Sequence, residues 1–240
     1  MPRSVPVGRM GDEIKRALGA AVLPRVNATN QRKDAQSTIV VVGNAPVAKD
    51  HTALVDRARW VYRFNRLDNY GHNTGTRTDF WILASHRVVL GQLAAAGHPG
   101  STKDAPPFRE VARAVQRILF AVPCLFRPLS ESAQRSDLAE RAAAARSFLR
   151  TIDSTDTPAA IHTYQRSVLA HLDPALCSPE RPSPSNGYLT IASLIEHSAL
   201  HQCNIAVIGF TWKGWQGHPW EAEERALRSF AANGQLSIIE

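Results

Sequence analysis

Two asparagines stand where a nucleotide-binding fold needs hydrogen-bonding groups. Asn44 follows the apolar run 38–42 and Gly43, and Asn65 follows the apolar stretch 59–64. A short apolar run that ends on glycine predicts a buried strand feeding a tight turn. With the helical stretch between them, the two runs form a βαβ unit, which binds nucleotides at the carboxyl ends of its strands. We expect Gly43, Asn44 and Asn65 to contact a ligand there; the alternative is that both asparagines only close turns.

A second candidate is Ser185, Asn186 and Gly187, which immediately precede a predicted helix at 188–200. Ser185 or Asn186 is a good N-cap, and Gly187 allows a ligand to approach the backbone closely. The free N–H groups and the positive dipole end of such a helix favour phosphate. Most sequences of this kind are helix caps without a ligand.

A third candidate is His218, which precedes Pro219 at the start of a helix predicted at 219–232. The helix dipole disfavours the imidazolium there, and a neutral imidazole can accept a hydroxyl proton as a general base. The alternative is that His218 only caps the helix. The other eight histidines lack ligand spacing such as H-E-x-x-H, so the sequence predicts no metal.

The composition indicates one globular domain with a basic leader. The chain has 240 residues, a net charge of +7 and a pI of about 9.8, which suits an anionic ligand, an anionic glycolipid surface or nucleic acid. Residues 1–36 carry seven Lys or Arg against three acids. We predict a flexible leader at 1–36, either solvated or a peripheral foot on the inner membrane, and a single domain at 37–240. No signal-peptide core, no apolar run of about 18 residues and no disulfide spacing is present, which favours a cytoplasmic protein.

Strands and helices alternate along the rest of the chain. Further strands are predicted at 78–84, 118–126, 159–164, 204–210 and 235–239, and helices at 108–119, 130–150, 165–172, 188–200 and 219–232. In the helix at 130–150 we expect Leu138, Ala142 and Leu149 to face inward. The alternation predicts an α/β fold with a Rossmann-like, mainly parallel sheet flanked by helices. The glycines fit neither G-x-G-x-x-G nor a P-loop, which argues against a dehydrogenase or a P-loop kinase.

Taken together and in this order, these pieces resemble the sialylmotifs of glycosyltransferase family 29, the sialyltransferases. The large motif is matched by VVGNAP…VDRARWVYRFN…GTRTD at 41–79, and the small motif by PSNGYLTIASLI…CNIAVIGF at 184–210. The very short motif, His-x4-Glu, is matched by His218 and Glu223. The resemblance covers roughly residues 38–225 and implies a GT-A variant fold of bacterial type.

The resemblance also implies a site without metal or cofactor for a CMP-linked sugar acid, sialic acid or a Kdo-like one. By position, Asn44 and Asn65 would hold the ribose and phosphate of CMP. Ser185 and Gly187 would contact the cytidine and phosphate, with Asn186 where the family usually has Thr. His218 would deprotonate the acceptor hydroxyl, and Glu223 would support the last helix and its histidine.

Two departures from the family pattern are visible. Cys203 is present, but Ile39 stands where animal members have its disulfide partner. The histidine of the third family motif, which stabilises the departing phosphate, is missing between residues 210 and 218. Lys213 could supply that positive charge, while Trp212 and Trp215 could line the acceptor site.

The leading prediction is thus an inverting glycosyltransferase that acts on a cell-surface glycan or glycolipid in lipopolysaccharide or capsule biosynthesis. One alternative is an enzyme of the same fold that uses another nucleotide sugar. The other is a non-catalytic nucleotide- or nucleic-acid-binding protein, suggested by the pI. The basic excess lies largely in residues 1–36, and no aromatic-rich basic strand resembles an RNA-binding surface, so we expect no specific nucleic-acid partner.

Overall fold

The computed structural model describes residues 38–101, 105–127, 129–153, 159–177, 183–198 and 203–240. They belong to one compact unit, Gln36–Glu240. The basic leader predicted at 1–36 lies outside the described residues, so its flexibility stays a prediction.

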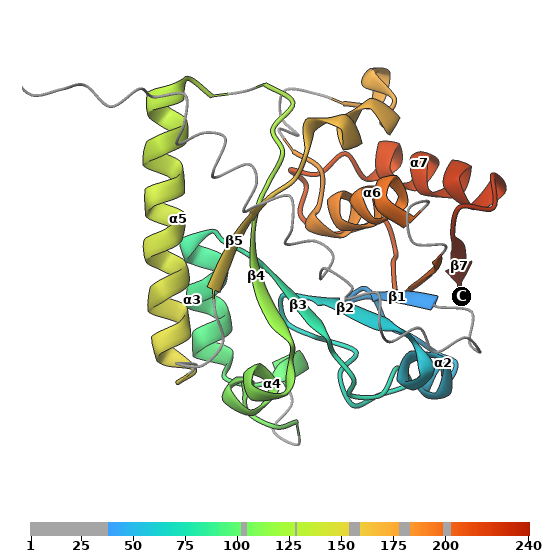
Figure 1. Ribbon diagram of the computed structural model, residues 1–240, viewed down its shortest axis with the longest axis horizontal. Helices are drawn as coiled ribbons and strands as arrows, with labels where there is room; N and C mark the ends of the chain where they lie inside the picture. The colour runs from blue at the N-terminus through green and yellow to red at the C-terminus, as the bar shows by residue number, and fades with distance from the viewer. Residues whose placement is uncertain (1–37, 102–104, 128, 154–158, 178–182, 199–202) are drawn as a thin grey trace, which may run out of the picture. The chain divides into compact units, whose positions relative to one another are not determined.

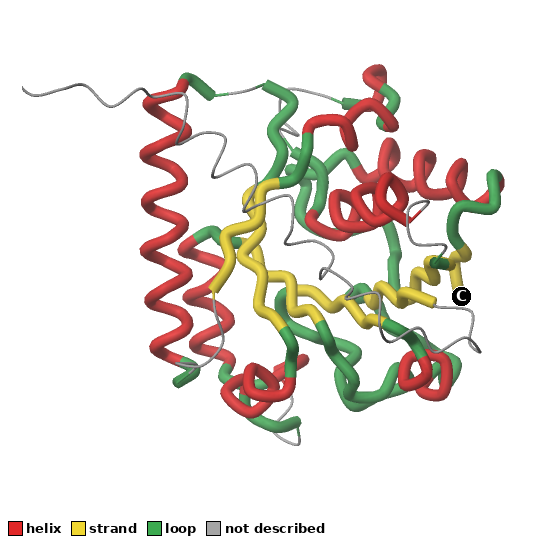
Figure 2. Tube along the Cα trace, in the orientation of Figure 1, coloured by secondary structure: helices red, strands yellow, loops and turns green. Residues whose placement is uncertain are grey.

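The described residues build a seven-stranded sheet in which every strand pair is parallel (Figures 1 and 2). The strand order is β5-β4-β3-β2-β1-β6-β7. The strands are β1 (Thr38–Val42), β2 (Trp60–Phe64), β3 (Phe80–Ala84), β4 (Arg117–Val122), β5 (Ala159–Thr163), β6 (Asn204–Ile208) and β7 (Ser237–Ile239). The predicted α/β, Rossmann-like fold is confirmed, and the sheet is wholly rather than mainly parallel.

The order of the strands places a topological switch beside β1. From β1 to β5 each strand adds to the same side of the sheet, and the chain then returns to lay β6 on the other side of β1. Val42 at the end of β1 pairs with Arg63 of β2 on one side and with Ile208 of β6 on the other. In open parallel sheets, ligands bind at the carboxyl ends of the strands at such a point.

Helices cover both faces of the sheet (Figures 1 and 2). They are α2 (Thr52–Arg57), α3 (Arg87–Ala96), α4 (Phe108–Ala114), α5 (Glu131–Thr151), α6 (Asn186–Ser198) and α7 (Trp220–Ala232), with short 3-10 turns η1 (Pro99–Ser101), η2 (Arg166–His171) and η3 (Pro174–Leu176). In Figure 1, α2 to α5 lie on one face, and α6 and α7 lie on the other. Burial of apolar side chains between these layers is the main force that holds the elements together.

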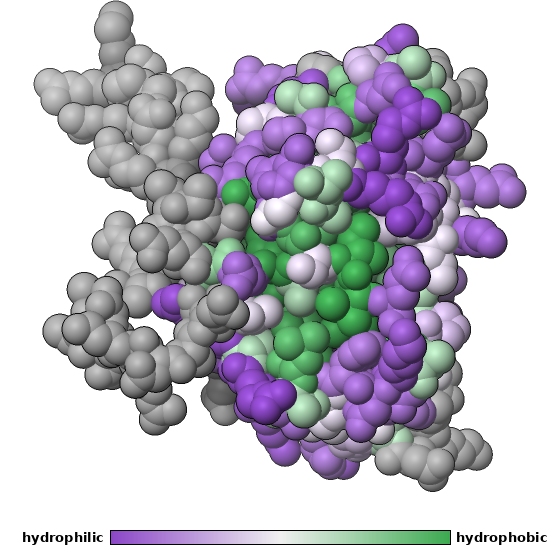
Figure 3. All heavy atoms as spheres, turned by 90° about the vertical axis from the view of Figure 1, so that its right-hand side faces the viewer, coloured by the Kyte–Doolittle hydropathy of each residue, from purple (hydrophilic) through white to green (hydrophobic). Residues whose placement is uncertain are grey.

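The side of the sheet that carries α2 to α5 has two apolar clusters. In the larger one, Trp81 and Phe120 of the sheet meet Phe148 of α5, with ring centroids 6.0 and 6.3 Å from that of Phe148. The smaller cluster includes Val40, and the partly buried Val47, Leu54 and Ile239 pack against it. Figure 3, which views the molecule from the right-hand side of Figure 1, shows apolar side chains gathered between hydrophilic borders.

Two helices differ from the prediction. The helix α3 was not predicted, because β-branched Val88 and Val89 and the internal Gly91 weaken its pattern. The helix predicted at 108–119 ends at Ala114, and Leu119 lies in β4 instead.

Leu138 was expected to face inward but is 37% exposed, whereas Leu149 is buried as predicted. The reason is where α5 lies along the sheet. Arg141 donates a hydrogen bond to the hydroxyl of Ser85 (3.2 Å), which directly follows β3. The ten residues of α5 before Arg141 therefore extend about 15 Å past that strand end at 1.5 Å per residue.

None of the described helices has both the length and the apolar character needed to cross a membrane.

A buried carboxylate at the start of β3 should matter to stability. Asp79 accepts hydrogen bonds from the Val61 N–H (2.8 Å) and from Gln116 Nε2 (2.9 Å), and pairs with Arg77 (3.3 Å). Asp79→Ala would leave a buried N–H and a guanidinium without this partner, so we expect the free energy of unfolding to fall by about 3 kcal/mol, measured by urea denaturation. Asp68→Ala, which breaks the more exposed pair with Arg66, should cost less than about 1 kcal/mol. Equal losses in the two variants would contradict this role.

Candidate functional site

Glycines bring the ends of β1 and β6 into direct contact. The Gly43 N–H donates to the Ile208 carbonyl (2.8 Å), and the Ala45 N–H donates to the Gly209 carbonyl (2.9 Å). A methyl group at Gly43 would overlap the Gly209 carbonyl oxygen and lie 2.9 Å from the Phe210 ring. A methyl group at Gly187 would lie 2.8 Å from the same ring. The structure thus brings Gly43 and Gly187 together, with the half-buried Phe210 ring against both.

The two predicted asparagines each tie one strand end to the next. Asn44 donates from Nδ2 to the Phe64 carbonyl (3.2 Å), and its Oδ1 accepts from the Asp68 N–H (3.2 Å). Asn65 has a φ of 42°, and its Oδ1 accepts from the Ala84 N–H (2.8 Å). Both side chains are at the carboxyl ends where they were predicted. Their oxygen atoms bond to backbone, which is the turn-closing arrangement that the sequence left open.

The first turn of α6 is fixed to the first turn of α7. Ser185 donates its N–H (2.7 Å) and its hydroxyl (2.6 Å) to the two carboxylate oxygens of Glu223. The Ser185 hydroxyl also accepts from the Tyr188 N–H (3.1 Å), which makes it the N-cap of α6. Glu223 is 1% exposed, and burial raises its pKa to about 7 against the opposing effect of the two hydrogen bonds. Glu223 therefore forms its hydrogen bonds with Ser185, the N-cap residue of α6.

His218 lies beside this junction. Its Nδ1 is 2.9 Å from the Ser183 carbonyl, which can only accept, so Nδ1 carries the proton and Nε2 is left as an acceptor. Burial lowers the pKa of His218, and the hydrogen bond to Ser183 opposes that shift. The rings of Trp215 and Trp220 meet the imidazole nearly perpendicularly, at 4.8 and 5.1 Å between centroids. A neutral imidazole at pH 7 follows from this burial.

Two further predicted residues belong to the same region. Asn186 is the first residue of α6 and is half-buried, and Lys213 is exposed in the loop between β6 and α7. The structure therefore gathers Ser185, Glu223 and His218 where α6 and α7 begin.

Sequence reasoning missed two side chains that shape this site, Asn69 and Phe210. Asn69 donates from Nδ2 to the carbonyls of Gly43 (2.8 Å) and Ala45 (2.7 Å) and so fixes the turn after β1. No motif points to it, because it is one of several polar residues in a turn-rich stretch. Phe210 could have been found, because it directly follows the apolar run of β6 and Gly209.

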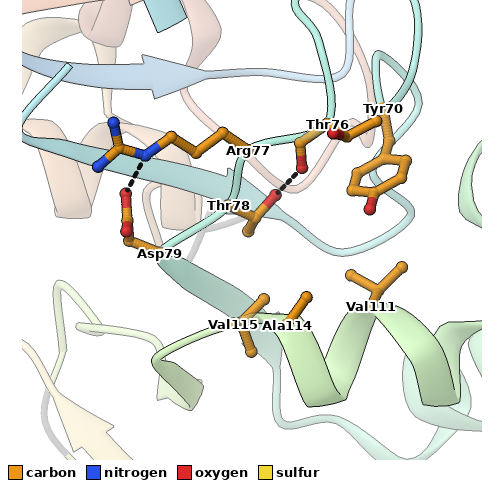
Figure 4. A pocket seen from close by; sticks show the side chains of 8 residues that line it. All are labelled: Tyr70, Thr76, Arg77, Thr78, Asp79, Val111, Ala114 and Val115. Carbon is orange, nitrogen blue, oxygen red and sulfur yellow. Dashed lines mark hydrogen bonds and ion pairs between the residues drawn. The ribbon is translucent and has the colours of Figure 1, made fainter. Parts of the chain in front are cut away.

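A cavity of about 220 Å³ lies at the opposite edge of the sheet, where β3 begins (Figure 4). Its lining comes from the stretch before β3 and from α4: Tyr70, Thr76, Arg77, Thr78, Asp79, Val111, Ala114 and Val115. Arg77 also donates to the carbonyls of Asp56 (2.8 Å) and Arg59 (3.0 Å). Residues 75–79, the end of the large sialylmotif-like stretch, thus lie away from the carboxyl edge and serve as a structural clamp.

Within the part of the chain that the structure describes, no three His, Cys, Asp or Glu side chains are grouped as metal ligands would be.

Comparison with known proteins changes the functional interpretation. No family model matches the chain. The chain is 28% identical over 204 residues to the urease operon 23 kDa accessory protein of Rhizobium meliloti (strain 1021). The similarity covers 82% of this chain and 90% of that protein.

The similarity to an accessory protein contradicts the sialyltransferase prediction. The assignments to glycosyltransferase family 29, to a CMP-sugar donor, to a glycan or glycolipid acceptor and to lipopolysaccharide or capsule biosynthesis are therefore wrong, as is the alternative of another sugar donor. The structure supplies a physical reason for the misleading pattern. Asn44, Asn65, Ser185 and Glu223 have the spacing of a catalytic motif, but their side chains hold strand ends and helix caps together. The general-base role of His218 and the phosphate-stabilising role of Lys213 in sugar transfer fall with that prediction.

The buried carboxylate predicts a specific pH dependence. Burial raises the pKa of Glu223 from 4.5 to about 7, so between these values the native protein binds more protons than the unfolded chain. The free energy of unfolding should then fall as pH rises, by roughly 3 kcal/mol relative to Glu223→Gln, at about 1.4 kcal/mol per pKa unit. Urea denaturation of both proteins from about pH 4.5 to about pH 7.5 measures the difference. Burial also lowers the pKa values of His162, a buried residue of β5, and of His218, but both histidines are present in the two proteins, so their contributions cancel. Parallel pH profiles would refute the buried-acid assignment.

Proposed function

We propose that this chain is a nucleotide-binding accessory protein that binds its ligand at the carboxyl edge between β1 and β6 and does not transfer a group. The observation that carries this proposal is the similarity to a urease operon accessory protein over most of both chains. The fold supports it independently, because the topological switch beside β1 is where open parallel sheets bind nucleotides.

Three groups at this edge suit a phosphate. The first turn of α6 begins with Asn186 and Gly187, and the N–H groups of a first helical turn have no acceptor within their helix. The positive end of the α6 dipole adds to their attraction for an anion. Lys213 supplies a full positive charge from the adjacent loop. The ligand would rest against the Phe210 ring, beside Gly43 and Gly187.

Binding without catalysis is consistent with how the reactive groups are used. The hydroxyl of Ser185 and the carboxylate of Glu223 bond to each other, so neither is presented to a substrate. The Nδ1 proton of His218 is held by Ser183, which leaves Nε2 as a hydrogen-bond acceptor for a ligand hydroxyl. Asn44 and Asn65 would shape the edge through the backbone that they hold.

Isothermal titration calorimetry of the full chain with ATP, ADP, GTP, GDP, CMP and UDP tests the binding. We expect one of these nucleotides to bind with 1:1 stoichiometry and to be recovered chemically unchanged after prolonged incubation. Lys213→Glu should weaken binding about tenfold, because it replaces attraction for phosphate by repulsion.

The matched control is Arg109→Glu, a charge reversal of an exposed side chain on α4, far from the carboxyl edge in sequence and fold. It should leave affinity unchanged. Binding of none of the nucleotides, conversion of the bound nucleotide, or equal losses in the two variants would contradict the proposal. Strongly salt-dependent binding of random oligonucleotides, without nucleotide binding, would favour the nucleic-acid alternative.

The accessory role has its own test in cells that carry this gene and make urease. Removal of the gene should lower urease activity while the amount of urease polypeptide, measured by immunoblot, stays the same. The wild-type chain should restore activity, and Lys213→Glu should restore less of it at equal expression. Unchanged urease activity after removal would contradict the accessory role.

A further inference from the structure

The loop between β6 and α7 exposes a tryptophan that the proposed site leaves unexplained. Trp215 is 64% exposed, the most exposed of the large apolar side chains among the described residues. An exposed side chain of this size carries a large apolar surface into water and offers a flat face on which a planar ligand can stack.

The backbone around Trp215 is fixed rather than loose. Its carbonyl accepts hydrogen bonds from the indole N–H of Trp220 (3.0 Å) and from the backbone N–H of His218 (3.2 Å). The first of these bonds joins the loop to the first residue of α7. The position of Trp215 is therefore set before any ligand arrives, which lowers the entropic cost of binding.

The ring itself is also placed. A methyl group at Gly217 would overlap the six-membered ring of Trp215, so the indole lies against the Gly217 backbone. His218 meets the ring nearly perpendicularly, with 4.8 Å between centroids. These two residues cover part of the indole, and Trp215 as a whole is still 64% exposed.

Trp215 lies near the groups that we propose for phosphate binding. His218, in contact with Trp215, bonds to Ser183, which is two residues before the N-cap of α6. Lys213, the cation of the same loop, is two residues before Trp215. Trp215 thus belongs to the loop that carries Lys213, and His218 links it to the segment that leads into α6.

We propose that Trp215 is the stacking platform for the base of the bound nucleotide, with Lys213 and the first turn of α6 taking its phosphate. This proposal rests on the proposed function. Stacking on one aromatic face tolerates any base, so affinity should depend on the presence of a base more than on its identity. A ribose phosphate without a base should bind much more weakly.

The test combines tryptophan fluorescence with calorimetry on the full chain, using the tightest nucleotide of the panel and ribose 5-phosphate as the probe without a base. Nucleotide should quench the wild-type fluorescence, and Trp215→Phe should remove that quenching while it keeps most of the affinity. Trp215→Ala should weaken binding at least fivefold, the lower end of the effect of removing one stacked base.

Gly217→Ala tests the placement of the ring without removing it. The added methyl should displace the exposed indole from its position against residue 217 and weaken nucleotide binding as Trp215→Ala does. The circular dichroism spectrum and the midpoint of thermal unfolding should stay near those of the wild type. The matched control is Val88→Ala, which shortens another exposed apolar side chain (57% exposed) and should not change affinity.

The outcomes separate the two proposals. If the wild type binds no nucleotide, both proposals are overturned. If it binds but Trp215→Ala and Gly217→Ala leave affinity and quenching unchanged, only the stacking role of Trp215 is overturned. Equal binding of ribose 5-phosphate and nucleotide would overturn it as well.

Discussion

The close approach of the turns after β1 and β6 is the contact on which the rest of this structure depends. A parallel sheet that reverses its strand order must place two strand exits side by side. Here Gly43 packs directly against the Gly209 carbonyl and the Phe210 ring. Any larger residue at position 43 would separate β1 from β6 at the edge where the ligand is proposed to bind. Asn69 strengthens the same contact by binding the carbonyls on both sides of Asn44.

Around this contact, polar side chains have structural roles, although their spacing in the sequence resembles a catalytic motif. Ser185 and Glu223 join the starts of α6 and α7, and Asn44 joins the exits of β1 and β2. In this chain, polar residues at these places close the sheet edge without taking part in a reaction in the structure described. The spacing of these residues can therefore arise from the structure of the sheet edge alone, without any catalytic role. This explains why the resemblance to sialyltransferases predicted the fold but not the function.

The loop after β6 differs from the rest of the edge. Elsewhere along it, polar side chains such as those of Asn44 and Ser185 bond to other protein groups, and the Phe210 ring is half-buried. In the loop, hydrogen bonds from Trp220 and His218 hold an exposed indole in place. A fixed aromatic surface that faces water is available to a planar ligand, so this loop is the part of the edge that the proposed ligand would complete.

The sequence by itself determined the order of the seven strands along the chain, because buried apolar runs such as 38–42 and 204–208 each end at a glycine, as strands of a parallel sheet often do. It missed one helix, α3. It also located Ser185, His218 and Glu223 near helix starts, since caps are local. It could not predict that α5 extends past the sheet and so exposes Leu138. Nor could it predict the hydrogen bond between Ser185 and Glu223, which are 38 residues apart. Those depend on how helices pack across the sheet, and so do the roles of Phe210, Asn69 and Trp215. Only the tertiary structure brings their partners together, because local sequence does not encode contacts between distant segments.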